Sequence, residues 1–171
     1  MNRIKQAFQN RTEKVIPYLV AGFPQKKDTL NMVLAAEKGG AAMVELGIPF
    51  SDPLADGPII QKASQIAIEN GVTISWILET VSKIRQQTEI PLALMGYINP
   101  IIKFGFKEFM KECCNSGVDG LIIPDLPLEE TEEYVDLASK NCISPILLVA
   151  PNTSRDRIKE ISKIANDLIC C

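Results

Sequence analysis

Six short apolar runs recur along the chain and predict buried strands. Each run is four to seven residues long and largely apolar rather than alternating with polar residues, which is typical of strands covered on both faces. The predicted strands are Val15–Ala21, Ala42–Leu46, Pro91–Met95, Gly120–Ile123, Pro145–Ala150 and Leu168–Cys171.

Amphipathic patterns fill the intervals between these runs and predict helices. They cover the segment from Leu30 to Lys38, then Ile59–Glu69, Ile74–Gln86, Phe106–Cys113, Thr131–Lys140 and Ser154–Ala165, with Ser154 or Asn152 as the N-cap of the last. The first ten residues carry Ile4, Ala7 and Phe8 at helical spacing. Alternating strands and helices with right-handed crossovers predict a parallel sheet.

A parallel sheet allows an open doubly wound fold or a closed (β/α)8 TIM barrel. The doubly wound fold expects a phosphate-binding glycine motif after the first strand, but Ala21–Pro24 is not GxGxxG, and no GxxxxGK[ST] occurs in the chain. The barrel is therefore favoured, as a single partial domain over residues 1–171 with an N-terminal helix across the N-terminal end of the barrel. Its functional residues are expected at the carboxyl ends of the strands.

The amino-acid composition excludes several classes of catalytic site, metal site and binding partner. The 171 residues include no histidine, which excludes Ser/His/Asp and Cys/His nucleophilic systems and every histidine-containing metal site. A net charge of −3 disfavours nucleic acid as a partner. Five cysteines, without CxxC spacing, indicate a reducing compartment, and no apolar stretch reaches the ~18 residues of a membrane span. With no secretory signal at the N-terminus, these features predict a cytoplasmic protein.

Glu45 is the most informative residue because a carboxylate near the carboxyl end of a buried strand is costly. It is either a structural residue, paired with a lysine or with backbone amides, or a catalytic carboxyl. In the catalytic case, desolvation would raise its pKa toward neutrality, as acid–base catalysis requires.

A stiff loop follows Glu45. Residues Gly47–Pro58 contain three prolines, two aspartates and two glycines. Asp52 precedes a proline and is suited to a turn, whereas Asp56 is suited to capping the next helix. Either carboxylate is alternatively a functional group at the active end of the barrel.

The segment Glu45–Pro58 resembles the signature of the tryptophan synthase alpha subunit family. Supporting motifs are Pro17–Pro24, Met95–Ile101, Gly117–Pro127 and Ala150–Thr153, so the resemblance extends over essentially the whole chain. It implies a carbon–carbon lyase of tryptophan biosynthesis that cleaves indole-3-glycerol phosphate to indole and glyceraldehyde 3-phosphate. No metal and no organic cofactor is implied for this chain.

The resemblance also implies residue roles in the active site. Glu45 would transfer protons, and Asp56 would hold the indole N–H and stabilise the positive charge that develops on the ring. Tyr18, Tyr97 and Ile122 would line the indole pocket, although aromatic packing at strand ends is an alternative role for each tyrosine. No strand-like run contains a lysine, which argues against a Schiff-base aldolase.

A partner is implied as well. Pro53, Asn99 and Pro127 match the loop positions with which the family contacts a tryptophan synthase beta subunit, in an alpha2beta2 type of complex. Indole would pass to that subunit, which carries pyridoxal phosphate.

Length is the main departure from the family. A complete barrel has eight units in about 250 residues, and its phosphate site is usually built after strands 7 and 8. Six predicted strands correspond to the N-terminal two-thirds of an alpha subunit. We therefore expect the 171-residue chain to be inactive by itself. It is either part of a working lyase or a truncated, non-catalytic remnant or binding module that at most engages the beta subunit.

Overall fold

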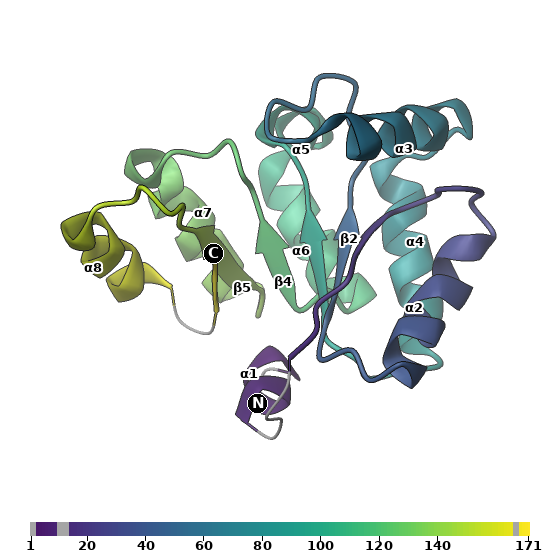
Figure 1. The fold of residues 1–171 in the computed structure, drawn as a ribbon, viewed down its shortest axis with the longest axis horizontal. Coiled ribbons are helices and arrows are strands. Elements are labelled where there is room, and N and C mark those ends of the chain that lie inside the picture. The colour runs from purple at the N-terminus through teal and green to yellow at the C-terminus, as the bar shows by residue number, and fades with distance from the viewer. Residues whose placement is uncertain (1–2, 10–13, 166–167) are drawn as a thin grey trace.

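The computed structural model describes residues 3–9, 14–165 and 168–171, and its centre is one parallel sheet (Figure 1). Six strands pair in chain order to form a curled half-barrel, and each overlaps one of the predicted apolar runs. The strands are β1 (Tyr18–Val20), β2 (Val44–Gly47), β3 (Leu92–Met95), β4 (Gly120–Ile122), β5 (Ser144–Leu148) and β6 (Ile169–Cys170).

Helices alternate with the strands and confirm a truncated TIM-barrel architecture. The helices are α1 (Arg3–Gln9), α2 (Asp28–Lys38), α3 (Pro58–Glu69), α4 (Ile74–Arg85), α5 (Ile98–Phe104), α6 (Phe106–Ser116), α7 (Thr131–Lys140) and α8 (Arg155–Ile164), with a 3₁₀ turn, η1, at Leu128–Glu130. Of the two N-cap candidates for α8, the structure selects Ser154, whose hydroxyl accepts from the Arg157 N–H at 3.2 Å. Among the described residues, no helix is long and apolar enough to span a membrane.

The sequence patterns did not predict α5. This helix has seven residues, holds Pro100 in its first turn and is separated from α6 only by Gly105. A proline is tolerated in the first turn, where the backbone N–H has no intrahelical acceptor. The helix is too short for an apolar repeat to establish a period.

Alternation along the strands divides the core into two layers. Ala93, Ile122 and Ile146 lie in a small cluster on the inner face of the sheet, together with Ile4 of α1. Neighbouring positions such as Leu92 and Leu94 belong to the larger cluster between the sheet and the outer helices. The strands are thus buried on both faces, which explains why their sequences are largely apolar.

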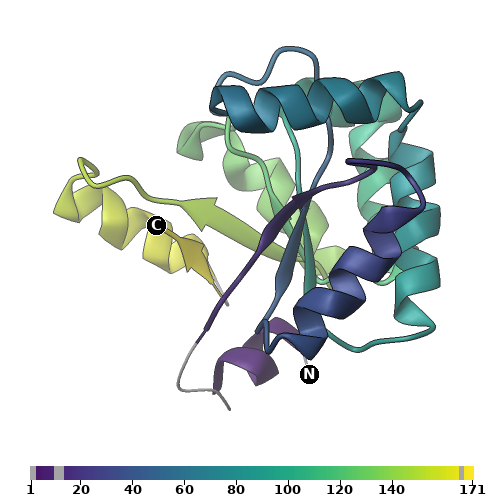
Figure 2. The ribbon, with the colours of Figure 1, turned by 45° about the vertical axis from the view of Figure 1, so that its right-hand side comes forward.

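Helix α1 lies at the end of the sheet opposite α3, as Figures 1 and 2 show. Its Ile4 side chain is fully buried, and Arg3 Nη1 donates to Asp119 Oδ1 at 2.9 Å. Arg85 Nη2 and the Leu92 N–H also donate to the Asp119 carboxylate. The predicted N-terminal helix is therefore present and tethered across the N-terminal end of the half-barrel.

Candidate active site

Glu45 lies on the inner face of β2, in register with Tyr18 of β1 and Ala93 of β3. The side chain is half-buried, and this burial raises the pKa of its carboxyl above the usual range. Within the described residues, no ion pair or hydrogen bond involves the carboxylate, so the structural pairing considered from sequence is not found there. A half-buried carboxyl with a raised pKa is compatible with the acid–base role considered from sequence.

Tyr18 leans along the inner face toward the carboxyl end of β2. A Cβ atom on Gly47 would lie 2.0 Å from Tyr18 Oη, so only glycine leaves room for this ring. Burial raises the pKa of Tyr18, and the charges of Asp56 and Glu45 add to that shift. Tyr18 therefore lies close enough to the carboxylates of Glu45 and Asp56 for their charges to affect its hydroxyl.

Asp56 lies in the loop between β2 and α3, and its side chain is half-buried. The interpretation of Asp56 as the cap of α3 is wrong, because Gly57 is the N-cap and no side chain caps this helix. The Asp56 carbonyl instead accepts from Gln61 Nε2 at 2.9 Å. Its carboxylate is therefore not used to cap α3. Asp52 is exposed and accepts from the adjacent Ser51 hydroxyl at 2.5 Å, consistent with a turn residue.

Tyr97 has a hydrogen bond that the sequence did not reveal. The Ala55 N–H donates to Tyr97 Oη at 3.0 Å, and the Tyr97 and Phe50 ring centroids are 5.5 Å apart. Burial raises the pKa of Tyr97, with a further contribution from the Asp56 carboxylate. The hydrogen bond with Ala55 and the ring contact with Phe50 both connect the end of β3 to the loop that carries Asp56.

Asp125 is a second residue without a role predicted from sequence. Its Oδ1 accepts from the Ile98 N–H at 3.0 Å, at the first turn of α5. Asp125 follows Pro124 in the loop after β4 and was visible in the sequence, but the helix that it contacts was not predicted. The hydrogen bond joins the loops that follow β3 and β4.

Ile122 lies at the end of β4 and is buried in the inner cluster with Ala93 and Ile146. It pairs in register with Met95, so β3 separates it from Glu45. Its place on the inner face, at the carboxyl end of a strand, is compatible with a wall of the same site.

The residues predicted to contact a partner follow three successive strands. Pro53 lies after β2, Asn99 in the first turn of α5 after β3, and Pro127 after β4, immediately before η1. Asn99 and Pro127 are exposed and Pro53 is half-buried. Because the strands are parallel, all three residues lie at the carboxyl-terminal end of the sheet, the end toward which the loop after Glu45 extends.

Comparison with known proteins identifies the family. Residues 4–171 match the family model described as tryptophan synthase alpha chain. The chain belongs to the tryptophan synthase alpha chain family. It is 49% identical over 171 residues to the tryptophan synthase alpha chain of Petrotoga mobilis, covering 100% of this chain and 66% of that protein. Identity to the Flavobacterium psychrophilum alpha chain is 44% over 170 residues, with 99% and 67% covered.

Solved structures of the family have the same fold. Tryptophan synthase subunit alpha from Legionella pneumophila superposes with a TM-score of 0.94 at 37% identity, over 99% of this chain and 66% of that one. A chain in the tryptophan synthase complex from Pyrococcus furiosus gives a TM-score of 0.87 at 40% identity, over 91% and 64%. The chain thus spans about two thirds of the length of the relatives it matches.

Proposed function

We propose that this chain supplies the catalytic carboxyls of a lyase that cleaves indole-3-glycerol phosphate to indole and glyceraldehyde 3-phosphate. The observation that carries the proposal is the half-buried Glu45 carboxyl with a raised pKa, beside Tyr18 and the loop bearing Asp56. Membership of the tryptophan synthase alpha chain family supports this substrate and this reaction. Retention of both carboxyls favours an enzyme over a non-catalytic binding module.

Glu45 would move the proton on which the reaction depends. The bond between indole C3 and the glycerol chain breaks only after C3 is protonated, because protonation turns the ring into an electron acceptor. The glycerol hydroxyl loses its proton as the aldehyde forms, so the net transfer is from that hydroxyl to C3. A carboxyl whose pKa is raised by burial is suited to both giving and taking this proton.

Asp56 would accept a hydrogen bond from the indole N–H and stabilise the positive charge on the protonated ring. Tyr18, Tyr97 and Ile122 would form walls for the ring, with Tyr97 also fixing the loop through Ala55. These steps require no metal and no organic cofactor bound to this chain.

The proposed partner is a tryptophan synthase beta subunit, which would hold pyridoxal phosphate and receive the indole. A relative from Pyrococcus furiosus is described as part of an a2b2 complex. In this chain Leu54, Ile59 and Ile102 are 88%, 81% and 60% exposed, close in sequence to Pro53 and Asn99. Exposed apolar residues beside the predicted contact positions support a protein interface. Because all five cysteines are free, we place this complex in the reducing cytoplasm.

Indole release from indole-3-glycerol phosphate tests the lyase. We would assay the chain alone and a chimera that continues residue 171 with the remaining third of the Petrotoga mobilis relative. The chimera should be active, whereas the chain alone should be inactive because barrel phosphate sites usually follow strands 7 and 8. Glu45→Gln and Asp56→Asn should each lower kcat of the chimera by about 10²- to 10⁴-fold.

Asp52→Asn is the matched control, since it removes one charge from an exposed residue of the same loop. Its kcat should stay within about threefold of the parent. Equal activity in all three variants would refute the assignment of the carboxyls.

Calorimetric titration of the chimera with the Petrotoga mobilis beta subunit tests the partner. Ile102→Asp should weaken binding by about tenfold or more, because it places a charge on an exposed apolar residue beside Asn99. Val15→Asp, at the opposite end of the sheet, changes an apolar residue of similar exposure, 66% against 60% for Ile102, and should leave binding unchanged. Absence of binding by the parent at tens of micromolar would exclude this partner.

A further inference from the structure

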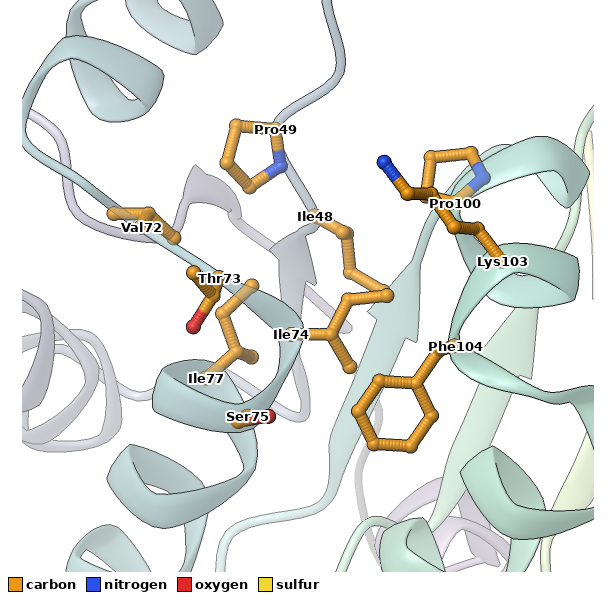
Figure 3. Close-up of a pocket in the computed structure, with 10 residues that line it drawn as sticks. All are labelled: Ile48, Pro49, Val72, Thr73, Ile74, Ser75, Ile77, Pro100, Lys103 and Phe104. Atoms are coloured by element: carbon orange, nitrogen blue, oxygen red, sulfur yellow. The ribbon is translucent and has the colours of Figure 1, made fainter.

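A pocket of about 380 Å³ lies outside the sheet, between the first turn of α4 and α5 (Figure 3). We call it the α4–α5 pocket. Ile48 and Ile77, which line it, belong to the outer core layer, whereas Glu45 lies on the inner face of β2. The pocket is therefore separate from the candidate active site.

The walls of the α4–α5 pocket are mainly apolar. Ile48, Ile74 and Phe104 come from three different segments, and Figure 3 shows their side chains directed toward one another. Pro49 and Pro100 flank the entrance. Its volume falls within the range of ~300–1,000 Å³ typical of small-molecule sites, which combine apolar walls with a few polar groups.

Polar groups stand at two places on this apolar lining. The Lys103 amine extends toward the entrance beside Pro100, and within the described residues it has no ion-pair or hydrogen-bond partner (Figure 3). Thr73 Oγ1 accepts from the Trp76 N–H at 3.2 Å, which leaves the hydroxyl proton free to donate. The pocket thus offers an apolar interior, one cation at its entrance and the hydroxyls of Thr73 and Ser75 at the first turn of α4.

We propose that the α4–α5 pocket binds a small aromatic carboxylate. The ring would lie among Ile48, Ile74 and Phe104, and the carboxylate would pair with Lys103. The apolar walls accommodate a hydrophobic group, the Phe104 ring favours an aromatic one, and the partnerless cation at the entrance favours an anion. The site lies beyond the proposed lyase reaction and uses none of its residues.

The position of Ile48 gives an occupant a direct contact with the loop that carries Asp56. The Ile48 N–H donates to the Met95 carbonyl at 2.7 Å, at the point where β2 passes into that loop. A Cβ atom on Gly96 would lie 2.8 Å from Ile48 Cδ1, so the side chain is closely packed against the end of β3. A ligand that displaces Ile48 must therefore also shift the start of the loop.

Titration of the ¹⁵N-labelled 171-residue chain with 2-naphthoate tests the proposal without measuring turnover, so its result is independent of the proposed lyase. We expect saturable shifts of the Ile74, Ser75 and Lys103 amides. Lys103→Met should weaken naphthoate binding about twofold to fivefold, the effect of one solvent-exposed ion pair, and leave the neutral 2-naphthalenemethanol unaffected. Ile74→Trp should fill the cavity and abolish both interactions. Lys107→Met is the control, because it removes an exposed lysine of α6 and should change neither affinity.

Several results would overturn the proposal. They are the absence of saturable shifts at millimolar naphthoate, naphthoate affinity that Lys103→Met leaves unchanged, or shifts centred on Tyr18 and Glu45. If naphthoate has no effect but a tryptophan synthase beta subunit perturbs Ile74 and Lys103, the pocket receives a protein partner and the small-molecule site is wrong. The Lys103→Met comparison remains decisive even if Ile74→Trp impairs folding.

Discussion

The hydroxyl of Tyr97 accepts a hydrogen bond from the backbone N–H of Ala55, 42 residues earlier in the chain, at a donor–acceptor distance of 3.0 Å. Tyr97 is only 4% exposed, so its ring is held in place by the residues packed around it. Ala55, in contrast, lies in an exposed part of the loop. This contact fixes the residue adjacent to Asp56. The order of the loop therefore depends on a side chain from the neighbouring strand end.

Tyr97→Phe should release this part of the loop while preserving the ring packing. Loss of one hydrogen bond of about 1 kcal/mol predicts roughly fivefold faster hydrogen exchange of the Ala55 amide. Tyr134→Phe is the control, because Tyr134 donates its hydroxyl proton to the Leu121 carbonyl in the buried core, away from the loop. That variant should lose stability without selectively accelerating exchange at Ala55. Unchanged exchange at Ala55 in Tyr97→Phe would contradict the role of the hydroxyl.

Glu45→Gln should stabilise the fold at high pH. Burial raises the folded-state pKa of Glu45 above its unfolded value, so the folded state binds this proton more tightly. The resulting stabilisation is fully present below the unfolded pKa and is lost as pH rises through the folded pKa. Relative to the parent, Glu45→Gln should thus gain free energy of unfolding between pH 4 and pH 8.

Urea denaturation at both pH values measures this gain. Glu79→Gln provides the same charge change on the exposed side of α4. A decrease in the relative stability of Glu45→Gln as pH rises would show that the buried carboxylate is favoured in its charged form.

Gly47→Ala should destabilise the carboxyl end of β2. The new methyl group would lie 2.0 Å from Tyr18 Oη, so the ring must move, at a cost of about 1–3 kcal/mol. Tyr18→Ala should relieve the clash, making the double variant more stable than the sum of the two single changes predicts. Thermal denaturation of the four proteins measures this coupling, and strictly additive effects would place the Tyr18 ring elsewhere.

Asp119→Asn should lower the free energy of unfolding by about 3 kcal/mol, because it leaves two arginines without their shared buried carboxylate. Glu89→Gln is the matched comparison, since Glu89 is exposed and pairs only with Arg3 among the described residues. It should change stability little, as exposed ion pairs contribute weakly. Chemical denaturation of both variants tests the difference, and equal effects would contradict a central role for Asp119 in holding α1.

The sequence by itself determined the strand positions, the main helices and the place of Glu45 at a strand end. These features follow from local patterns, because burial on two faces produces largely apolar runs and burial on one helix face produces a repeat near 3.6 residues. Because the predicted strands are parallel, the loops with Asp56, Asn99 and Pro127 could be assigned to one end of the sheet without knowledge of side-chain contacts.

Only the tertiary structure decided which side chains meet. The Tyr97–Ala55 hydrogen bond, the Tyr18 ring over Gly47 and the Asp119 network each join residues distant in sequence. Such contacts depend on strand register, sheet curvature and rotamers, none of which leaves a periodic signal in the chain. The sequence placed the carboxyls at one end of the barrel, whereas three-dimensional packing determined the burial of Glu45 and the anchoring of the loop that carries Asp56.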